Sequence, residues 1–242
     1  MSEERTGLAL SRETDSELQG RYAGVGGVEL LEAVIKVEFP GRVALVSSFG
    51  AHSVVLLDMV ARVDPTAAVI FLQTGKLFAE TGEYRKMLTA KLGLQNVQEV
   101  EPTHADLAKH DPDGTLWQRD QDKCCTIRKS LPLDRALVDF DAWITGRKRY
   151  QGGERENLET LEYADGKWKV NPLAHWSRGD IDSYLREREL PAHPLFEHGY
   201  LSIGCEPCTS PVAEGHDERS GRWADSEKKE CGIHRPRYRS DY

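Results

Sequence analysis

The sequence predicts an α/β fold with a mainly parallel sheet and helices on both of its faces. Two observations lead to this prediction. Short apolar runs rich in β-branched residues alternate with stretches of helical period over residues 43–100. The apolar runs also end in loops of small or polar residues. Repeated strand–helix–strand units build parallel sheets, and such sheets bind ligands beyond the carboxyl ends of their strands.

The first predicted helix covers residues 28–39 and ends at Pro40. Val28, Leu31 and Ile35 share one side of it, at spacings of three and four. Strands are predicted at residues 43–46, 67–72, 96–100 and 140–145. Further helices are predicted at residues 54–61, 80–92, 124–138 and 178–189. A hairpin at residues 161–170 is expected to turn at Asp165-Gly166. The helix at 124–138 is expected to begin on two adjacent cysteines and to kink or break at Pro132.

The chain divides into three parts: a polar leader at residues 1–24, an α/β domain at residues 25–212 and a C-terminal tail at residues 213–242. The leader has no sustained periodicity, so we expect no regular structure there. From about Ala213 the chain is charged and almost free of apolar runs, which predicts a mobile tail. The sequence leaves the oligomeric state open, a homo-oligomer included.

Bulk properties indicate a reducing compartment and a small ligand. The 242 residues carry a net charge of −8, which disfavours non-specific binding to nucleic acid. Five cysteines, an odd number, argue against a secreted disulfide scaffold. The start lacks the apolar core of a signal peptide, and no stretch reaches the length of a membrane span. We therefore expect a cytoplasmic protein with neither a nucleic acid nor a membrane as partner.

The loop at residues 47–53 joins a predicted strand to a helix and is rich in small residues. Such a loop can cradle a phosphate, because its backbone N–H groups point at the anion and serine hydroxyls add donors. Plain connectors have the same pattern, so both interpretations stay open. Two further loops follow predicted strands: Gln73-Thr74-Gly75-Lys76 and the basic run Arg147-Lys148-Arg149, which alone fits a solvated surface equally well.

Four of the five cysteines form two tight pairs, Cys124-Cys125 and Cys205-x-x-Cys208. Four thiolates can hold zinc or an iron–sulfur cluster. Adjacent cysteines suit a cluster better than a single ion, because the metal atoms of a cluster are spread out, so we expect one [4Fe–4S] cluster per chain. Lys129 nearby would stabilise its negative charge or attract an anionic substrate. Zinc, unrelated buried thiols and a redox dithiol at the second pair are the alternatives.

The fifth cysteine, Cys231, lies in the charged tail beside His234 and several cations. Positive surroundings lower the pKa of a thiol and raise its thiolate fraction. A mobile thiolate could act as a nucleophile in a substrate pocket and also reach a partner protein. The alternative is a surface cysteine without a role.

These motifs together resemble the family of assimilatory adenylyl-sulfate (APS) and phosphoadenylyl-sulfate (PAPS) reductases, and within it the iron–sulfur branch that mostly reduces APS. The resemblance covers nearly all of residues 43–234. It rests on Ser-Ser-Phe-Gly-Ala at 47–51, Thr74-Gly75 with Glu80-Thr81, Cys-Cys-x-x-Arg-Lys at 124–129, Thr145-Gly146 with basic residues after it, Gly-Tyr-x-Ser-Ile-Gly-Cys-x-Pro-Cys-Thr at 199–209, Arg-x-Gly-Arg-Trp at 219–223 and Glu-Cys-Gly-Ile-His at 230–234.

The resemblance implies an adenine-nucleotide α-hydrolase-like fold with a modified PP-loop, and reduction of APS to sulfite and AMP in sulfate assimilation. In such enzymes the tail cysteine, here Cys231, attacks the sulfur of the sulfate group, AMP leaves and a cysteine S-sulfonate remains. Thioredoxin or glutaredoxin then releases sulfite through a mixed disulfide. The cluster, held by Cys124, Cys125, Cys205 and Cys208, is expected to act structurally and electrostatically and not to pass electrons.

The same resemblance assigns the site residues. The expected catalytic residues are Cys231, Lys129 and His234. Charge builds on the departing AMP phosphate, so the substrate site needs cations and hydrogen-bond donors. The expected substrate-binding residues are Ser47, Ser48, Gly50, Ser53, Thr74, Gly75, Lys148, Arg149, Arg219 and Arg222.

The chain departs from the usual family pattern at His52, Gln73, Lys148 and Tyr150, which leaves the nucleotide contacts open. One alternative is a PAPS or dual-specificity reductase, although the PAPS enzymes generally lack the four cluster cysteines. The alternative of another class is a PP-loop ATP pyrophosphatase that transfers sulfur to tRNA. The acidic net charge and the lack of a full Ser-Gly-Gly-x-Asp-Ser loop argue against it.

Overall fold

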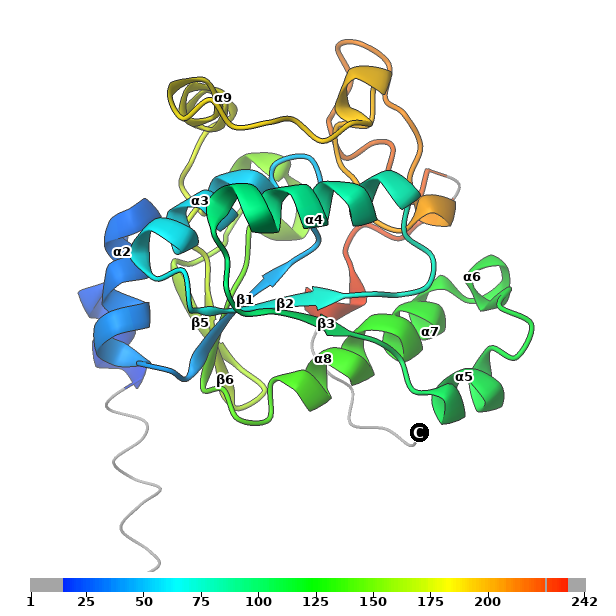
Figure 1. Cartoon of the computed structure of the whole chain (residues 1–242), viewed down its shortest axis with the longest axis horizontal. Helices are drawn as coiled ribbons and strands as arrows, with labels where there is room; N and C mark the ends of the chain where they lie inside the picture. The colour runs from blue at the N-terminus through cyan, green and yellow to red at the C-terminus, as the bar shows by residue number, and fades with distance from the viewer. Residues whose placement is uncertain (1–14, 225, 235–242) are drawn as a thin grey trace, which may run out of the picture.

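A computed structural model of the chain describes residues 15–224 and 226–234, and it shows an α/β fold built on one sheet (Figure 1). In this described part the sheet has six strands in the order β3-β2-β1-β4-β6-β5, parallel except for β5. The strands are β1 Val43–Ser47, β2 Ala68–Leu72, β3 Val97–Val100, β4 Ala142–Ile144, β5 Leu161–Ala164 and β6 Lys167–Val170. The predicted fold class is confirmed.

Helices cover both faces of the sheet, as the alternating pattern predicts. One face carries α2 Gly27–Ala33, its π-helical continuation Val34–Glu38, α3 Ser53–Val63, α4 Ala79–Leu92 and α9 Arg178–Glu187. The other face carries α5 His104–His110, α6 Leu116–Arg119, α7 Gln121–Cys125, a π-helical turn Thr126–Ser130 and α8 Leu131–Ala136 (Figure 1).

The core has two layers because successive strand residues point to opposite faces. On β1, Leu45 packs into the layer under α3 and α4, whereas Ala44 packs with Trp143 and Leu133 in the layer under α8. Leu45, Trp143 and Leu133 are at most 2% exposed. Truncating a buried side chain of this kind costs about 2–5 kcal/mol of stability.

The hairpin and the capped helix form where the sequence predicts them. Asp165 and Gly166 join β5 to β6 with φ values of 55° and 77°, and a tight hairpin turn needs such positive φ angles. The Ser177 hydroxyl accepts from the backbone N–H of Asp180, whose carboxylate accepts from the backbone N–H of Ser177. This reciprocal cap starts α9.

Three local expectations are corrected. Residues 15–21 are helical, and Leu18 and Tyr22 pack against the core, so part of the leader is structured; residues 1–14 lie outside the described part. The helix at the cysteine pair begins at Gln121, not at Cys124, because the Asp120 side chain caps it by accepting from the backbone N–H of Lys123. The expected break at Pro132 does not occur: residues 121–136 stay helical, and Pro132 lies in the first turn of α8, directly after the π-helical turn Thr126–Ser130.

The described part of the tail lies against the domain. Trp223 is 3% exposed, and the His234 ring stacks on Trp143 with centroids 5.6 Å apart. Lys228 forms an ion pair with Asp122 of α7. The structure therefore shows a docked position of the tail, and its mobility stays a prediction. In the described residues, no helix is both long and apolar enough to span a bilayer.

Candidate active site

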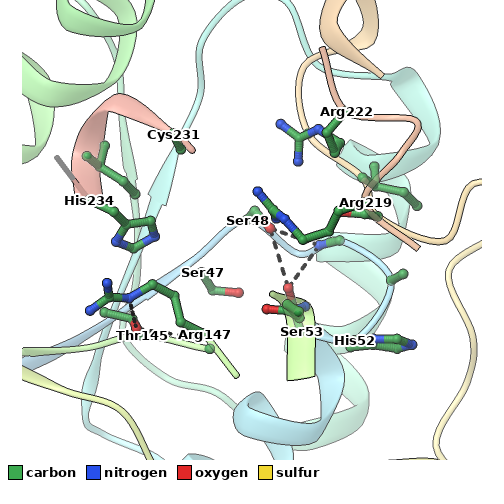
Figure 2. Close-up of a pocket in the computed structure, with 18 of the residues that line it drawn as sticks. Ser47, Ser48, His52, Ser53, Thr145, Arg147, Arg219, Arg222, Cys231 and His234 are labelled. Atoms are coloured by element: carbon green, nitrogen blue, oxygen red, sulfur yellow. Dashed lines mark hydrogen bonds between the residues drawn. The ribbon is translucent and has the colours of Figure 1, made fainter. Parts of the chain in front are cut away.

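The candidate active site is a cavity of about 210 Å³ beyond the carboxyl ends of β1 and β4. Loop 201–205 and the tail line its other side, as Figure 2 shows in part. Most of the predicted catalytic and substrate-binding residues lie on its wall: Ser47, Ser48, Gly50, Ser53, Thr74, Lys129, Lys148, Arg219, Arg222, Cys231 and His234. The parallel sheet thus brings together segments that are far apart in the sequence.

Serine side chains shape the loop that follows β1. The backbone N–H of Gly50 donates to the Oγ atoms of Ser48 at 3.3 Å and Ser53 at 3.0 Å (Figure 2), and Ser53 begins α3. A Cβ atom at Gly50 would lie 2.9 Å from the carbonyl oxygen of Ile203, so a larger residue would push loop 201–205 away. The N-terminus of α3 beside two hydroxyls is an arrangement that can bind an anion.

Cys231 lies at the cavity with its Sγ atom 4.0 Å from the Lys129 Nζ atom. The Cys125 thiol hydrogen-bonds to Cys231, and this bond together with the Lys129 charge outweighs burial and lowers the pKa of Cys231 well below its ordinary value. The pKa of Cys125 rises correspondingly. Burial lowers the pKa of Lys129, but the potential of Cys205, Cys231 and Cys125 reverses this and raises it. Both shifts favour a thiolate on Cys231 beside an ammonium group on Lys129.

Of the remaining cysteines, Cys205 lies on the cavity wall and interacts electrostatically with Cys124. Cys124 and Cys205 are 9% and 7% exposed, and burial, followed by the potential of Cys205, raises the pKa of Cys124 to about 11. The Cys205 Sγ lies 3.3 Å from the Thr74 hydroxyl. The backbone N–H of Glu206 donates to the Lys76 carbonyl at 2.8 Å. The loop after β2 therefore positions the second cysteine pair against the first.

The donor set fits the predicted cluster by its chemistry. Its four members are all free thiols, three of them are buried, and Cys124, Cys205 and Cys208 interact electrostatically. Cys125 is the member that faces Cys231. In residues 15–224 and 226–234, no His, Cys, Asp and Glu side chains form a group arranged around a single metal ion. The [4Fe–4S] cluster stays a proposal.

Positive charge dominates the cavity wall. Six Lys or Arg side chains and two carboxylates line it. Lys148 is 3% exposed and donates to the carbonyl oxygen of Gly146 at 3.0 Å, and burial lowers its pKa to about 8. Burial, followed by the charge of Arg155, lowers the pKa of Arg219 to about 10. Arg222 lies over the Trp223 ring at 4.4 Å. A wall of this kind favours an anionic ligand.

Two predicted substrate-binding residues lie off the cavity wall. Gly75 donates its N–H to the Gln73 side chain at 3.2 Å, and its Cα faces Arg128, which bridges Asp111 and the Thr74 carbonyl. Arg149 donates to the Leu158 carbonyl at 2.7 Å and pairs with Glu159. In this structure both residues make their hydrogen bonds within loops outside the cavity wall, and their role toward substrate stays a prediction.

His234 is held by the domain. Its ring stacks on Trp143 with an interplanar angle of 5°, and its Nδ1 atom is buried without a hydrogen-bond partner among the described residues. Burial and the charge of Arg147 lower the pKa of His234 well below its ordinary value. The imidazole is therefore neutral near pH 7.

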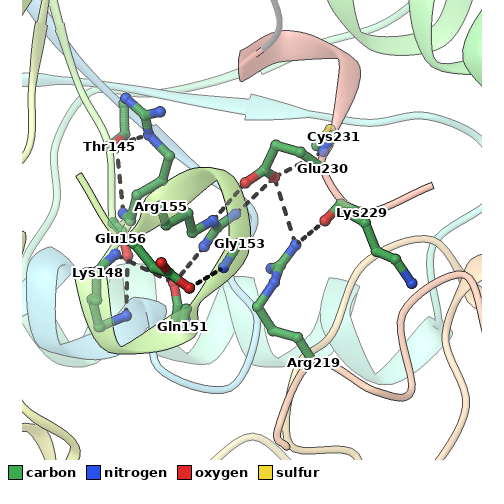
Figure 3. Close-up of polar contacts among 12 residues, drawn as sticks. Thr145, Lys148, Gln151, Gly153, Arg155, Glu156, Arg219, Lys229, Glu230 and Cys231 are labelled. Atoms are coloured by element: carbon green, nitrogen blue, oxygen red, sulfur yellow. Dashed lines mark hydrogen bonds and ion pairs between the residues drawn. The ribbon is translucent and has the colours of Figure 1, made fainter. Parts of the chain in front are cut away.

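The sequence indicates no role for several residues of the cavity wall, above all Arg155 and Glu230. Arg155 lies in the stretch Gly-Glu-Arg-Glu, which has the pattern of a solvated surface. It is instead 8% exposed and forms two hydrogen bonds to Glu230, which is 3% exposed (Figure 3). Burial raises the pKa of Glu230, but Arg155 outweighs this and holds it below its usual range. The one feature of the sequence that points to Glu230 is its position directly before the isolated cysteine, Cys231.

Residues 42–211 match the family model described as phosphoadenosine phosphosulfate reductase domain. The chain is 48% identical over 217 residues to an adenosine 5′-phosphosulfate reductase of Mesorhizobium japonicum, covering 90% of this chain and 85% of that protein. It is 35% identical over 237 residues to a phosphoadenosine 5′-phosphosulfate reductase of Gloeobacter violaceus, covering 96% of this chain and 98% of that protein.

Two solved structures share the fold. The phosphoadenylyl-sulfate reductase of Candida auris, in complex with phosphate, has a TM-score of 0.63 at 25% identity and covers 77% of this chain and 90% of its own. Yeast FAD synthetase in complex with FAD has a TM-score of 0.52 at 16% identity and covers 76% of this chain and 65% of its own. The second likeness concerns the fold alone.

Proposed function

The chain belongs to the phosphoadenosine phosphosulfate reductase family, and on that premise we propose that it reduces adenylyl sulfate (APS) to sulfite and AMP with a thioredoxin-type dithiol as electron donor. The observation that carries the proposal is the Cys231 Sγ atom 4.0 Å from the Lys129 Nζ atom in a cavity lined with cations. The relatives are reductases of nucleotide sulfates, so a nucleophilic sulfur at an anion site could attack the sulfate group of such a substrate.

In the first half-reaction, the Cys231 thiolate attacks the sulfur atom of the sulfate group. The bond between that sulfur and the bridging oxygen breaks, and its electron pair stays on the AMP phosphate. Lys129 lies where it can stabilise the charge of the sulfonate group. Lys148, the hydroxyls of Ser48 and Ser53 and the N-terminus of α3 supply the charge and donors that the departing phosphate needs.

In the second half-reaction, one thiolate of the dithiol protein attacks the Cys231 sulfur atom. Sulfite leaves with the electron pair of the broken sulfur–sulfur bond, and a mixed disulfide remains. The second thiol of the donor then attacks that disulfide, which frees Cys231 as a thiolate. The dithiol supplies the two electrons that convert sulfate sulfur to sulfite. The tail must leave the cavity for this step, because Cys231 is only partly exposed in the docked position.

A [4Fe–4S] cluster would be held by Cys124, Cys125, Cys205 and Cys208. When bound, it would supply fixed negative charge and cross-link α7 to loop 201–208, without taking part in electron transfer. The residues of the chain itself bind the anion and hold the nucleophile. Lys129 would then stand between two negative groups, the cluster and the sulfate end of the substrate.

Reduction of PAPS is the second candidate, because the chain covers 98% of a relative named as a PAPS reductase. Sulfite release should therefore be measured with APS and with PAPS, in the presence of thioredoxin and of glutaredoxin. Faster turnover of APS supports the proposal, and faster turnover of PAPS would contradict it. ATP consumption in the same assay would instead support the pyrophosphatase that transfers sulfur to tRNA.

A further inference from the structure

A buried ion pair joins the tail to the domain next to the nucleophile. The Arg155 Nε atom donates to one carboxylate oxygen of Glu230 at 2.5 Å, and the Nη2 atom donates to the other at 2.8 Å (Figure 3). The two residues are 75 positions apart. Two parallel hydrogen bonds to a carboxylate fix both distance and orientation. The pair therefore determines where residue 230 sits relative to loop 151–155.

The same carboxylate fixes the backbone of the nucleophile. The backbone N–H of Cys231 donates to the Glu230 Oε1 atom at 2.8 Å. Arg219, from an earlier part of the tail, supports this arrangement, because it donates to the Lys229 carbonyl at 3.0 Å and lies 3.6 Å from the same Oε1 atom (Figure 3). Domain, tail and nucleophile thus meet at one carboxylate group.

Both partners of this pair are buried, unlike those of the other Lys or Arg ion pairs that the described tail makes with the domain: the Arg178 side chain in the Arg178–Glu218 pair is 39% exposed. Lys228 pairs with Asp122, whose side chain is 61% exposed, and exposed pairs contribute little. Removing one partner of a buried pair leaves an uncompensated charge in a dry site and is strongly unfavourable. When the tail moves out as a unit, water solvates both partners. The ion pair can therefore hold the tail in one position and still separate reversibly when the tail moves away from the domain.

We infer that the Arg155–Glu230 ion pair is a latch that holds the tail closed and positions Cys231 against Lys129. Glu230 is then a positioning residue that acts through the backbone of Cys231. The role of the latch in catalysis rests on the proposed function, since the tail must be closed for attack on the sulfate sulfur and open for the dithiol donor. The closed position itself can be measured without any substrate.

The test is limited trypsin digestion of the folded full-length protein without nucleotide. Tail opening exposes the bonds after Lys228 and Lys229, and mass spectrometry gives the rate of cleavage there. The variants Arg155→Gln and Glu230→Gln should each raise that rate about tenfold or more, because each leaves a buried charge unpaired. The double variant should cleave no faster than the faster single variant, because residues that act as one unit are not additive. Glu230→Asp should recover part of the protection.

Glu227→Gln is the matched control, since it removes an exposed carboxylate from the same segment. Its cleavage rate should stay within about twofold of the parent protein, as for most surface substitutions. Parent-like rates for Arg155→Gln and Glu230→Gln would overturn the latch. Cleavage spread over the sheet would overturn it too, because the pair would then stabilise the whole fold.

A kinetic measurement separates this inference from the proposed function. If the protein reduces APS, Glu230→Gln should lower kcat more than it raises KM, because the substrate cations remain while the nucleophile is misplaced. Loss of tail protection in a protein that does not reduce APS would leave the latch standing and contradict the function. If Glu230→Gln leaves the tail as resistant to trypsin as in the parent, and the parent reduces APS, the latch is contradicted and the proposed function stands.

Discussion

The two sides of the cavity are built in different ways. The domain side consists of loops that follow strands of one sheet, and the core fixes their positions through residues such as Leu45 and Trp143. The described part of the tail is held by side-chain contacts: the Arg155–Glu230, Lys228–Asp122 and Arg178–Glu218 ion pairs, the stack of His234 on Trp143 and the burial of Trp223. We expect the loops of the domain side to keep their positions, whereas the proposed function requires the side that carries Cys231 to leave the cavity. Substitutions on the two sides should therefore affect different quantities.

The largest effect is expected from Cys231→Ser. Sulfite release should fall by about a thousandfold or more, because the variant lacks the thiolate. The melting temperature and the affinity for APS should change little, since the side chain belongs to the tail side. Turnover assays, thermal denaturation and binding titrations would check this. Residual sulfite release within tenfold of the parent would place the nucleophile elsewhere.

Cys205→Ala should affect the domain side. The variant should lose the bound iron that we propose and should be destabilised by several kcal/mol, because a thiolate ligand and a buried side chain are lost together. Iron analysis, visible absorbance and thermal denaturation are the measurements, with Cys231→Ala as the control that keeps its iron. Zinc in place of iron in anaerobically prepared protein would refute the cluster.

Lys148 gives a pH test of the anion site. Burial lowers its pKa to about 8, and the protonated form binds the anion, so affinity for APS should fall as the pH rises through 8, by up to about tenfold per unit. Between pH 8 and the ordinary value of 10.5, the unfolded chain binds more protons at this group, so its contribution to stability should rise.

Lys148→Arg is the matched variant for this test, because arginine stays charged over the whole range. Its affinity for APS should lose the dependence on pH near 8. Binding titrations from pH 6 to pH 10 would show this, and an unchanged pH profile in the variant would assign the titration to another group.

Gly232→Ala should produce the smallest effect and one confined to the tail. A Cβ atom at Gly232 would lie 3.2 Å from the Cys125 Cβ atom and 3.4 Å from the Ser130 Oγ atom. Docking should weaken by about 1 kcal/mol, which is roughly fivefold in the closed population. Alkylation of Cys231 by iodoacetamide would report it, with an unchanged melting temperature as the control. Unchanged alkylation would mean that the tail does not pack this closely on the helix.

The sequence predicts the domain side well and the tail side poorly, for a physical reason. Strand period and the small residues after β1 are local signals, so they suffice to place the loop with Ser48 and Gly50 beyond a strand end. The Arg155–Glu230 pair joins positions 75 residues apart, and its two side chains have the same pattern as solvated surface charges. The contact of Cys125 with Cys231 is equally non-local, so the sequence indicates four paired cysteines but not which of them faces the fifth.

Peptide mass spectrometry after a single turnover with APS, without a reductant, tests the role of Cys231 most sharply. We predict one SO₃ adduct per chain, located on the peptide that contains Cys231, with release of an equal amount of AMP. The adduct should disappear on addition of thioredoxin, with release of sulfite. An adduct on Cys125 or another residue, or AMP release without any adduct, would contradict the assignment of the chemistry to the tail.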